Sequence, residues 1–190
     1  MNLIRKNDKR LRLLESAREL IHTQGFSKTT LADIAQHADV PLGNVYYYYK
    51  TKEMLALAVI ERFSKNLKYH LQGLNDLDGP VLRLNALLLE VEEEVTVIAE
   101  SGYFLNSLSL EFSREQGVLG QATRALFCQL LSWIEQQFVQ LVSSEHAAEC
   151  AQKYMSQLQG AALLTQALAD TYVLEKQLCD LKRWIEGLTQ

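Results

Sequence analysis

The chain has 190 residues, 48% hydrophobic and 22% charged, with only two prolines and nine glycines, which excludes a sandwich or barrel built from many tight turns. Its longest hydrophobic run, Met54–Ile60, is too short for the ~20 residues of a membrane span, and its charged N-terminus is unlike a signal peptide. Residues 1–52 hold 9 Lys and Arg against 5 Asp and Glu, and residues 53–190 hold 10 against 18, so the net charge of −4 divides into +4 and −8. We expect a soluble, cytoplasmic, mostly helical protein whose two segments bind different partners.

Hydrophobic residues recur at helical spacing along the whole chain, and capping signals divide them into helices. Gly25 stands where a left-handed helix stop belongs, and Thr30 with Asp33 three residues later predicts a capped helix start. Pro41 and Thr51 mark two further starts. About nine helices are therefore expected, at 7–24, 31–38, 42–48, 52–74, 81–100, 104–116, 118–143, 146–169 and 172–188. The fold class is all-α.

The second and third helices, joined by a short turn, form a helix-turn-helix arrangement. Ile34, Val40 and Val45 are spaced to face one small core, and Tyr49, one turn after Val45, is expected to pack inward. The third helix then presents its other face to solvent, with Leu42, Gly43, Asn44, Tyr47 and Tyr48.

Such a face fits the DNA major groove, where asparagine can pair with adenine and an apolar side chain can contact the thymine methyl group. Hydroxyl and ammonium groups at the edges of the motif are suited to phosphate oxygens. The residues expected to bind double-stranded DNA are Thr30, Leu42, Gly43, Asn44, Tyr46, Tyr47, Tyr48 and Lys52.

The stretch from Gly25 to Leu55 resembles the tetracycline-repressor (TetR) family. The matching pattern is a threonine that opens the second helix, an Ile-Ala pair within it, a valine in the turn, a glycine and a tyrosine soon after, and a Lys-Glu-x-Leu start of the fourth helix. Those positions are Thr30, Ile34, Ala35, Val40, Gly43, Tyr46, Lys52, Glu53 and Leu55. At two places the sequence departs from the family pattern. The family often has glycine where this chain has Asp39, and aspartate also tolerates a left-handed turn. The family often has His and Phe where this chain has Tyr48 and Tyr49.

The resemblance implies a homodimeric bacterial transcription factor, usually a repressor, that binds a palindromic operator and is released by a small-molecule effector. It implies an N-terminal three-helix helix-turn-helix DNA-binding domain at residues 1–52. A C-terminal helical bundle for ligand binding and dimerisation would follow at residues 53–190.

The last two predicted helices carry regular hydrophobic seams of the kind found in helix bundles. A two-fold protein reads a palindrome with recognition helices ~34–36 Å apart, so we interpret the seams as a dimer interface. The alternative is that both seams pack inside one subunit. The interface residues expected are Met155, Leu158, Ala162, Thr165, Leu174, Leu178, Leu181 and Ile185.

A pocket for the effector is expected among the fourth to eighth helices, although each candidate could instead be an ordinary core residue. The pocket candidates are Tyr103, Phe104, Asn106, Phe112, Phe127, Gln129 and Trp133. The histidines are scattered, and no metal-ligand spacing, phosphate loop or nucleophile motif occurs. We therefore expect no metal, no cofactor, no catalytic residue and no enzyme activity.

Two other functions remain open at this point. Cys128, Cys150 and Cys179 could make the protein a thiol-based redox- or electrophile-sensing regulator. The same fold could also serve a ligand-independent architectural DNA-binding or interaction protein.

Overall fold

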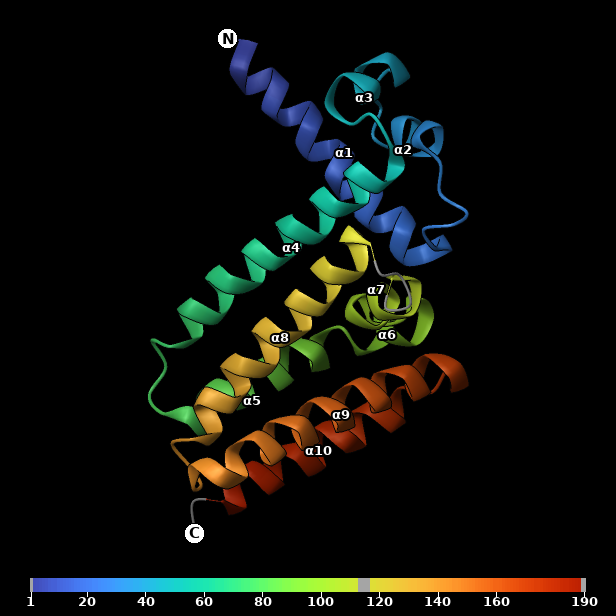
Figure 1. Ribbon diagram of the computed structural model, residues 1–190. Helices are drawn as coiled ribbons and strands as arrows, with labels where there is room; N and C mark the ends of the chain where they lie inside the picture. The colour runs from blue at the N-terminus through green and yellow to red at the C-terminus, as the bar shows by residue number, and fades with distance from the viewer. Residues whose placement is uncertain (1, 113–116, 189–190) are drawn as a thin grey trace. The chain divides into compact units, whose positions relative to one another are not determined.

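The computed structural model describes residues 2–112 and 117–188, with the backbone alone for residues 2–8. All regular structure within these ranges is helical, which confirms the all-α fold class (Figure 1). None of the helices in the described ranges has the length and hydrophobicity to cross a membrane. The helices are α1 (Asn2–Gln24), α2 (Leu31–His37), α3 (Leu42–Tyr48), α4 (Lys52–Leu74), α5 (Pro80–Glu93), α6 (Val95–Ser101), α7 (Phe104–Phe112), α8 (Val118–Phe138), α9 (Ser144–Leu168) and α10 (Thr171–Gly187).

Most helix boundaries lie within two residues of those expected, and larger differences occur in three places. The expected helix at 81–100 is bent at Glu94 into α5 and α6. Helix α8 ends at Phe138 rather than at 143, because the N–H groups of Leu141 and Val142 turn back to the carbonyl of Phe138. Helix α1 begins five residues earlier than expected. Residues 113–116 of the expected helix at 104–116 lie outside the described residues.

The predicted capping signals are confirmed. Gly25 has a φ of +87° directly after α1, a backbone conformation that glycine adopts without strain. The hydroxyl of Thr30 accepts a hydrogen bond from the N–H of Asp33, and the carboxylate of Asp33 accepts one from the N–H of Thr30. Asp39, in the turn before α3, has a φ of +50°, so it takes the left-handed conformation that the family more often gives to glycine.

The chain divides into two compact units. Unit 1 consists of the described residues in 1–65 and 107–124, and unit 2 of those in 66–106 and 125–190. Helices α4, α7 and α8 each contribute residues to both. The core of unit 1 is formed by fully or nearly fully buried side chains on α1 to α4 and α7, among them Leu13, Ala17, Ile34, Val45, Leu55 and Phe112.

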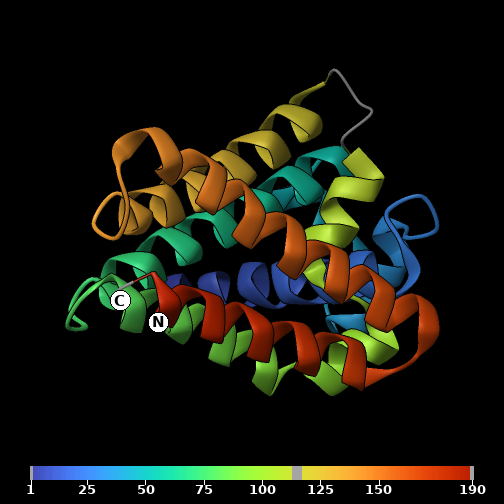
Figure 2. The same cartoon turned by 90° about the horizontal axis from the view of Figure 1, so that it is seen from below.

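In unit 2, α9 and α10 lie side by side, with α5 against α10 and α6 against α9 (Figures 1 and 2). The hydroxyl of Tyr154, a fully buried side chain of α9, donates to the carbonyl oxygen of Leu84 at 2.9 Å. Burial raises the pKa of this phenol well above its ordinary value, so the hydroxyl stays protonated and remains a donor. Arg83 closes the α4–α5 loop by donating to the carbonyl oxygens of Leu77 and Asn75.

The seam residues that the sequence assigns to a dimer interface are buried within a single subunit. An interface side chain must be accessible in the single chain, yet all of these are at most 7% exposed within one subunit. The seams therefore hold α9 and α10 inside unit 2, which is the alternative raised by the sequence. The side chains concerned are Met155, Leu158, Ala162, Thr165, Leu174, Leu178, Leu181 and Ile185.

Candidate nucleic-acid interface

The helix-turn-helix predicted from the sequence is present as α2, a turn at 38–41, and α3. The N–H of Val40 donates to the carbonyl of Ala35 at 2.9 Å, which fixes the turn. Ile34, Val40 and Val45 are at most 4% exposed, so they form the small common core that their spacing predicts. This core fixes the angle at which α3 leaves the motif.

The outer face of α3 is presented to solvent. Leu42, Tyr46 and Tyr47 are 39%, 47% and 62% exposed, and an added Cβ at Gly43 would meet no atom within 4 Å. Asn44 and Tyr48 are half-buried, and the rings of Tyr47 and Tyr48 meet edge to face with centroids 5.1 Å apart. Such an open surface, with one amide group among aromatic and small residues, has the shape and chemistry that base reading needs.

Tyr49, directly after α3, packs inward as predicted and is only 4% exposed. Its hydroxyl accepts a hydrogen bond from Nε of Arg10 on α1 at 3.1 Å. Arg10 therefore helps to orient the end of α3 from a position 39 residues away. Sequence reasoning did not identify this role, because nothing in the local pattern links α1 to the end of α3.

The hydroxyl of Thr30 is already engaged within the helix cap. It donates to the carboxylate of Asp33 at 2.7 Å, and this bond together with that from the N–H of Thr30 lowers the pKa of the Asp33 carboxyl. A contact between Thr30 and phosphate, which the sequence predicts, would need this hydroxyl to exchange partners.

Lys52, also predicted to bind phosphate, lies on carbonyl groups of its own chain. Its Nζ atom donates to the carbonyl of Phe26 at 2.7 Å and lies 3.5 Å from that of Ser27. The same ammonium lies 4.2 Å from the centroid of the Phe26 ring. Lys52 thus links the α1–α2 turn to the start of α4.

We expect Lys52→Met to lower the free energy of unfolding by about 1 kcal/mol, because it removes the donor to these carbonyls and keeps the apolar stem. Urea denaturation measures this loss. The dependence of DNA affinity on salt should stay unchanged. If the variant instead keeps its stability, and the slope of log affinity against log salt concentration falls by about one, Lys52 binds phosphate as the sequence predicts.

The pocket candidates separate between the two units. Phe112 belongs to unit 1, where it is fully buried and its ring meets that of Phe26 edge to face, with centroids 5.0 Å apart. The other six all lie in unit 2: Tyr103, Phe104, Asn106, Phe127, Gln129 and Trp133.

The roles of three of these six follow from their hydrogen bonds or their burial. The indole N–H of Trp133 donates to the side-chain oxygen of Asn75 at 3.1 Å, and the side chain of Asn106 donates to the backbone carbonyl of Gln159 at 3.0 Å. Burial, aided by the carboxylates of nearby glutamates, raises the pKa of the Tyr103 phenol above its ordinary value. Trp133 and Asn106 therefore hold structure together, and Tyr103 keeps a neutral hydroxyl.

The cysteines are all free, with Cys128 and Cys179 exposed and Cys150 half-buried. Burial raises the pKa of the Cys150 thiol, which reduces its thiolate fraction and its reactivity. Within the described ranges, no three His, Cys, Asp or Glu side chains lie together in a way that could hold a metal ion.

Comparison with known proteins links this geometry to a family. Residues 13–59 match the family model described as bacterial regulatory proteins, tetR family. An uncharacterised HTH-type transcriptional regulator of Lactococcus lactis is 25% identical over 185 residues, 92% of each chain, and the Escherichia coli repressor NemR is 27% identical over 66% of this chain and 62% of its own. A TetR-family regulator from Streptomyces coelicolor shares the fold, with a TM-score of 0.81, 15% identity and 97% coverage of both chains.

The chain spans between 31% and 92% of the length of the first curated relatives that it matches. The residues that match the family model, 13–59, include the helix-turn-helix and parts of its flanking helices α1 and α4. The same residues carry the open face of α3.

Proposed function

Because this chain belongs to the TetR family of bacterial regulatory proteins, we propose that it represses transcription as a homodimer bound to a palindromic operator. The observation that carries the proposal is the exposed face of α3 in the helix-turn-helix. A small-molecule effector would release it from DNA in the cytoplasm, where a bacterial chromosome lies. Residues 1–52 would bind DNA, and residues 53–190 would bind the effector and the second subunit.

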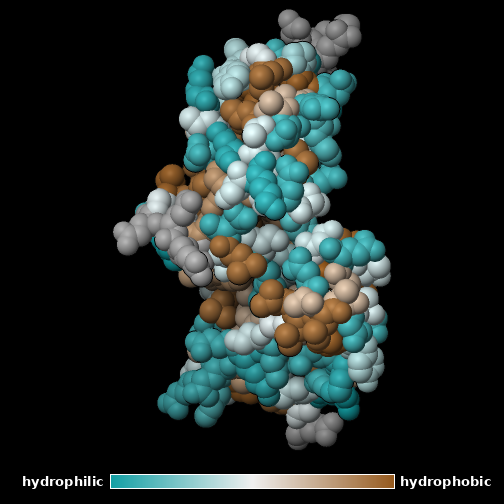
Figure 3. Space-filling view, turned by 90° about the vertical axis from the view of Figure 1, so that its right-hand side faces the viewer, coloured by the Kyte–Doolittle hydropathy of each residue, from teal (hydrophilic) through white to brown (hydrophobic). Residues whose placement is uncertain are grey.

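The exposed hydrophobic surface of α9 is the part of unit 2 best suited to a second copy. Leu163, Leu164 and Leu168 are 44%, 52% and 63% exposed, and Tyr172 at the start of α10 is 64% exposed. An added Cβ at Gly160 would meet no atom within 4 Å, so a partner helix could approach closely there. The end where α9 meets α10 faces the viewer in Figure 3, and hydrophobic side chains gather on that face. Contiguous hydrophobic surface of this kind is typical of interaction sites.

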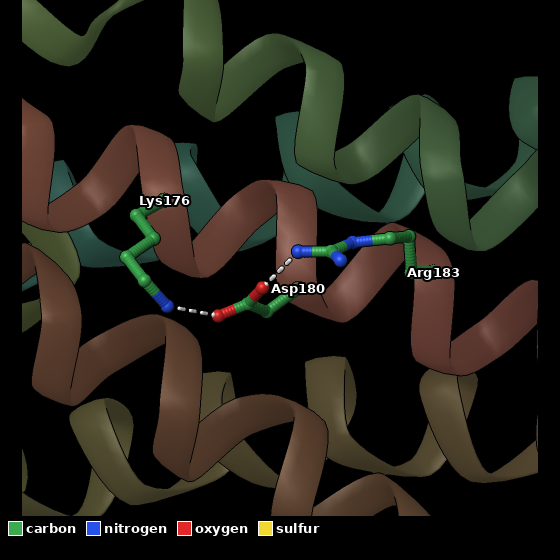
Figure 4. Close-up of polar contacts among 3 residues, drawn as sticks. All are labelled: Lys176, Asp180 and Arg183. Carbon is green, nitrogen blue, oxygen red and sulfur yellow. Dashed lines mark hydrogen bonds and ion pairs between the residues drawn. The ribbon is translucent and has the colours of Figure 1, made fainter.

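Charged side chains continue this surface along α10. Asp180 accepts hydrogen bonds from Lys176 at 2.7 Å and from Arg183 at 2.5 Å, and these bonds lower the pKa of its carboxyl (Figure 4). The three side chains thus form hydrogen-bonded ion pairs within a single helix. They suit the polar rim of an interface around the apolar centre on α9.

Operator recognition can be tested through Asn44, the one amide on the outer face of α3. We expect Asn44→Ala to weaken binding to the operator by about 1–3 kcal/mol and to leave binding to random DNA unchanged, because only base contacts carry sequence information. The operator is first obtained by selection from random DNA, which should enrich a two-fold symmetric site. If the selection enriches no symmetric site, the proposed function is wrong.

A thiol-sensing regulator is the second candidate, and the exposure of Cys128 and Cys179 favours it. A relative whose solved structure is titled a reduced form, NemR of Escherichia coli, shares the fold with a TM-score of 0.78 at 22% identity. Alkylation of the thiols should change operator affinity under this hypothesis. Unchanged affinity after complete alkylation would exclude it.

A further inference from the structure

A buried amide group in unit 2 has no hydrogen-bond partner among the described residues. Both Oε1 and Nε2 of Gln159, on α9, are shielded from solvent and unpaired, whereas Asn85 and Thr165 in the same unit each have a single atom of this kind. Buried polar groups in native proteins are almost always paired, since an unpaired one loses its hydration without compensation. The side chain of Gln159, half-buried as a whole with both polar atoms shielded, is therefore a candidate contact for another molecule.

The neighbours of Gln159 on its own helix include buried apolar residues, and its backbone contacts α7. Met155 and Ala162, one turn before and after it, are 7% and 0% exposed. The side chain of Asn106, on α7, donates to the backbone carbonyl of Gln159 at 3.0 Å. Helix α7 starts in unit 2 and continues into residues that belong to unit 1, the unit of the helix-turn-helix. A molecule bound at Gln159 would thus lie beside a helix shared with the DNA-binding part.

Building on the proposed function, we propose that the amide of Gln159 recognises the effector, and that the effector is a neutral molecule with a donor next to an acceptor, such as a carboxamide or a lactam. A primary amide offers one acceptor and two donors in a plane, so an amide-like group can pair with both of its ends at once. A carboxylate has no donor for Oε1, and an ammonium has no acceptor for Nε2. Either charged group would leave one end of Gln159 unpaired.

The acidic side chains of unit 2 define the competing possibility, a cationic effector. Glu90 and Glu94 act on the buried phenol of Tyr103, and burial raises the pKa of Glu90 itself. Nε2 of His70 lies 2.8 Å from Oε1 of Glu90, so this carboxylate already has a partner. Gln159 has none, which favours the neutral ligand.

The test uses benzamide, benzoate and benzamidine, three molecules of the same shape that carry a neutral, an anionic and a cationic group. Ligand-observed NMR titration of the full chain should give a Kd on the order of 1 mM for benzamide and binding at least about 5-fold weaker for the other two. Gln159→Leu should weaken benzamide binding about 10-fold, while Gln152→Leu, an exposed glutamine on the same helix, should change nothing. Gln159→Glu should shift the preference to benzamidine, because a carboxylate accepts two N–H donors from an amidinium.

The proposal is overturned if the unchanged chain does not bind benzamide below about 20 mM, or if Gln159→Leu binds it equally well. A preference of the unchanged chain for benzamidine would assign recognition to Glu90 and Glu94 instead. Selection of an operator from random DNA is independent of these titrations. Failure of the amide titration with a successful selection therefore removes only this inference. The reverse outcome removes the proposed repressor, and with it the effector role of the ligand, while binding at Gln159 itself stands.

Discussion

Leu164→Glu is expected to make the protein monomeric and to weaken operator binding at least about 100-fold. Leu164 is 52% exposed and stands between Leu163 and Leu168 on the hydrophobic surface of α9. In the proposed dimer, two-fold symmetry would bring two new carboxylates into the same desolvated contact. A monomer reads one half-site, so about half of the specific contacts with a palindrome are lost. Sedimentation and operator titration measure the two effects.

The matched control for this variant is Leu82→Glu. Leu82 lies on α5, is 53% exposed, and is outside the surface proposed for the dimer. It should leave both the mass in solution and operator affinity unchanged. If Leu164→Glu remains dimeric, or if Leu82→Glu is the variant that becomes monomeric, the α9 surface is not the contact between subunits.

The parts of the fold that were predicted correctly depend on local chemistry. The capping box of Thr30 and Asp33 acts within four residues, and the left-handed residues Gly25 and Asp39 depend only on their own backbone preferences. The helix-turn-helix core formed around Val45 spans fewer than 20 residues, so spacing alone identifies it. Such features depend on residues close together in the sequence, so the sequence alone predicts them.

The surface that we propose for the dimer could not be assigned in this way, because both faces of α9 are hydrophobic. One face carries Met155 and Leu158, which are buried inside the subunit, and the other carries Leu163 and Leu164, which are exposed. Helical periodicity identifies each stripe and does not identify what covers it. The choice depends on where α5, α6 and α10 pack, and these contacts join residues far apart in the chain.

The candidate site also combines features that local sequence predicts with contacts between residues far apart in the chain. The exposed face of α3 follows from helical spacing, whereas the engagement of Lys52 with the carbonyl of Phe26 joins residues 26 positions apart. Phe112 is a predicted pocket residue because it is one of the aromatic residues available among the fourth to eighth helices. Its actual partner, Phe26, could only be found from the tertiary structure.

Phe112→Ala is expected to lower the free energy of unfolding by about 3–5 kcal/mol, a large share of the stability of a typical domain. Phe112 is 0% exposed, and its ring packs edge to face on Phe26 with an interplanar angle of 70°. The Phe26 ring in turn lies under the ammonium of Lys52. Removing the Phe112 ring leaves a cavity beneath the α1–α2 turn, where the carboxylate of Glu111 already lies close against Gly25. Urea denaturation measures the loss.

Leu110→Ala is the control, because Leu110 lies on the same helix and is 68% exposed. It should change the free energy of unfolding by no more than about 0.5 kcal/mol. A loss below about 1.5 kcal/mol for Phe112→Ala would mean that the ring is not an essential part of unit 1. The expected pair of results would instead show that the end of α7 stabilises the turn before α2. Any effector that displaced α7 would then weaken support for the helix-turn-helix itself, since only a ligand that distinguishes two states can shift the balance between them.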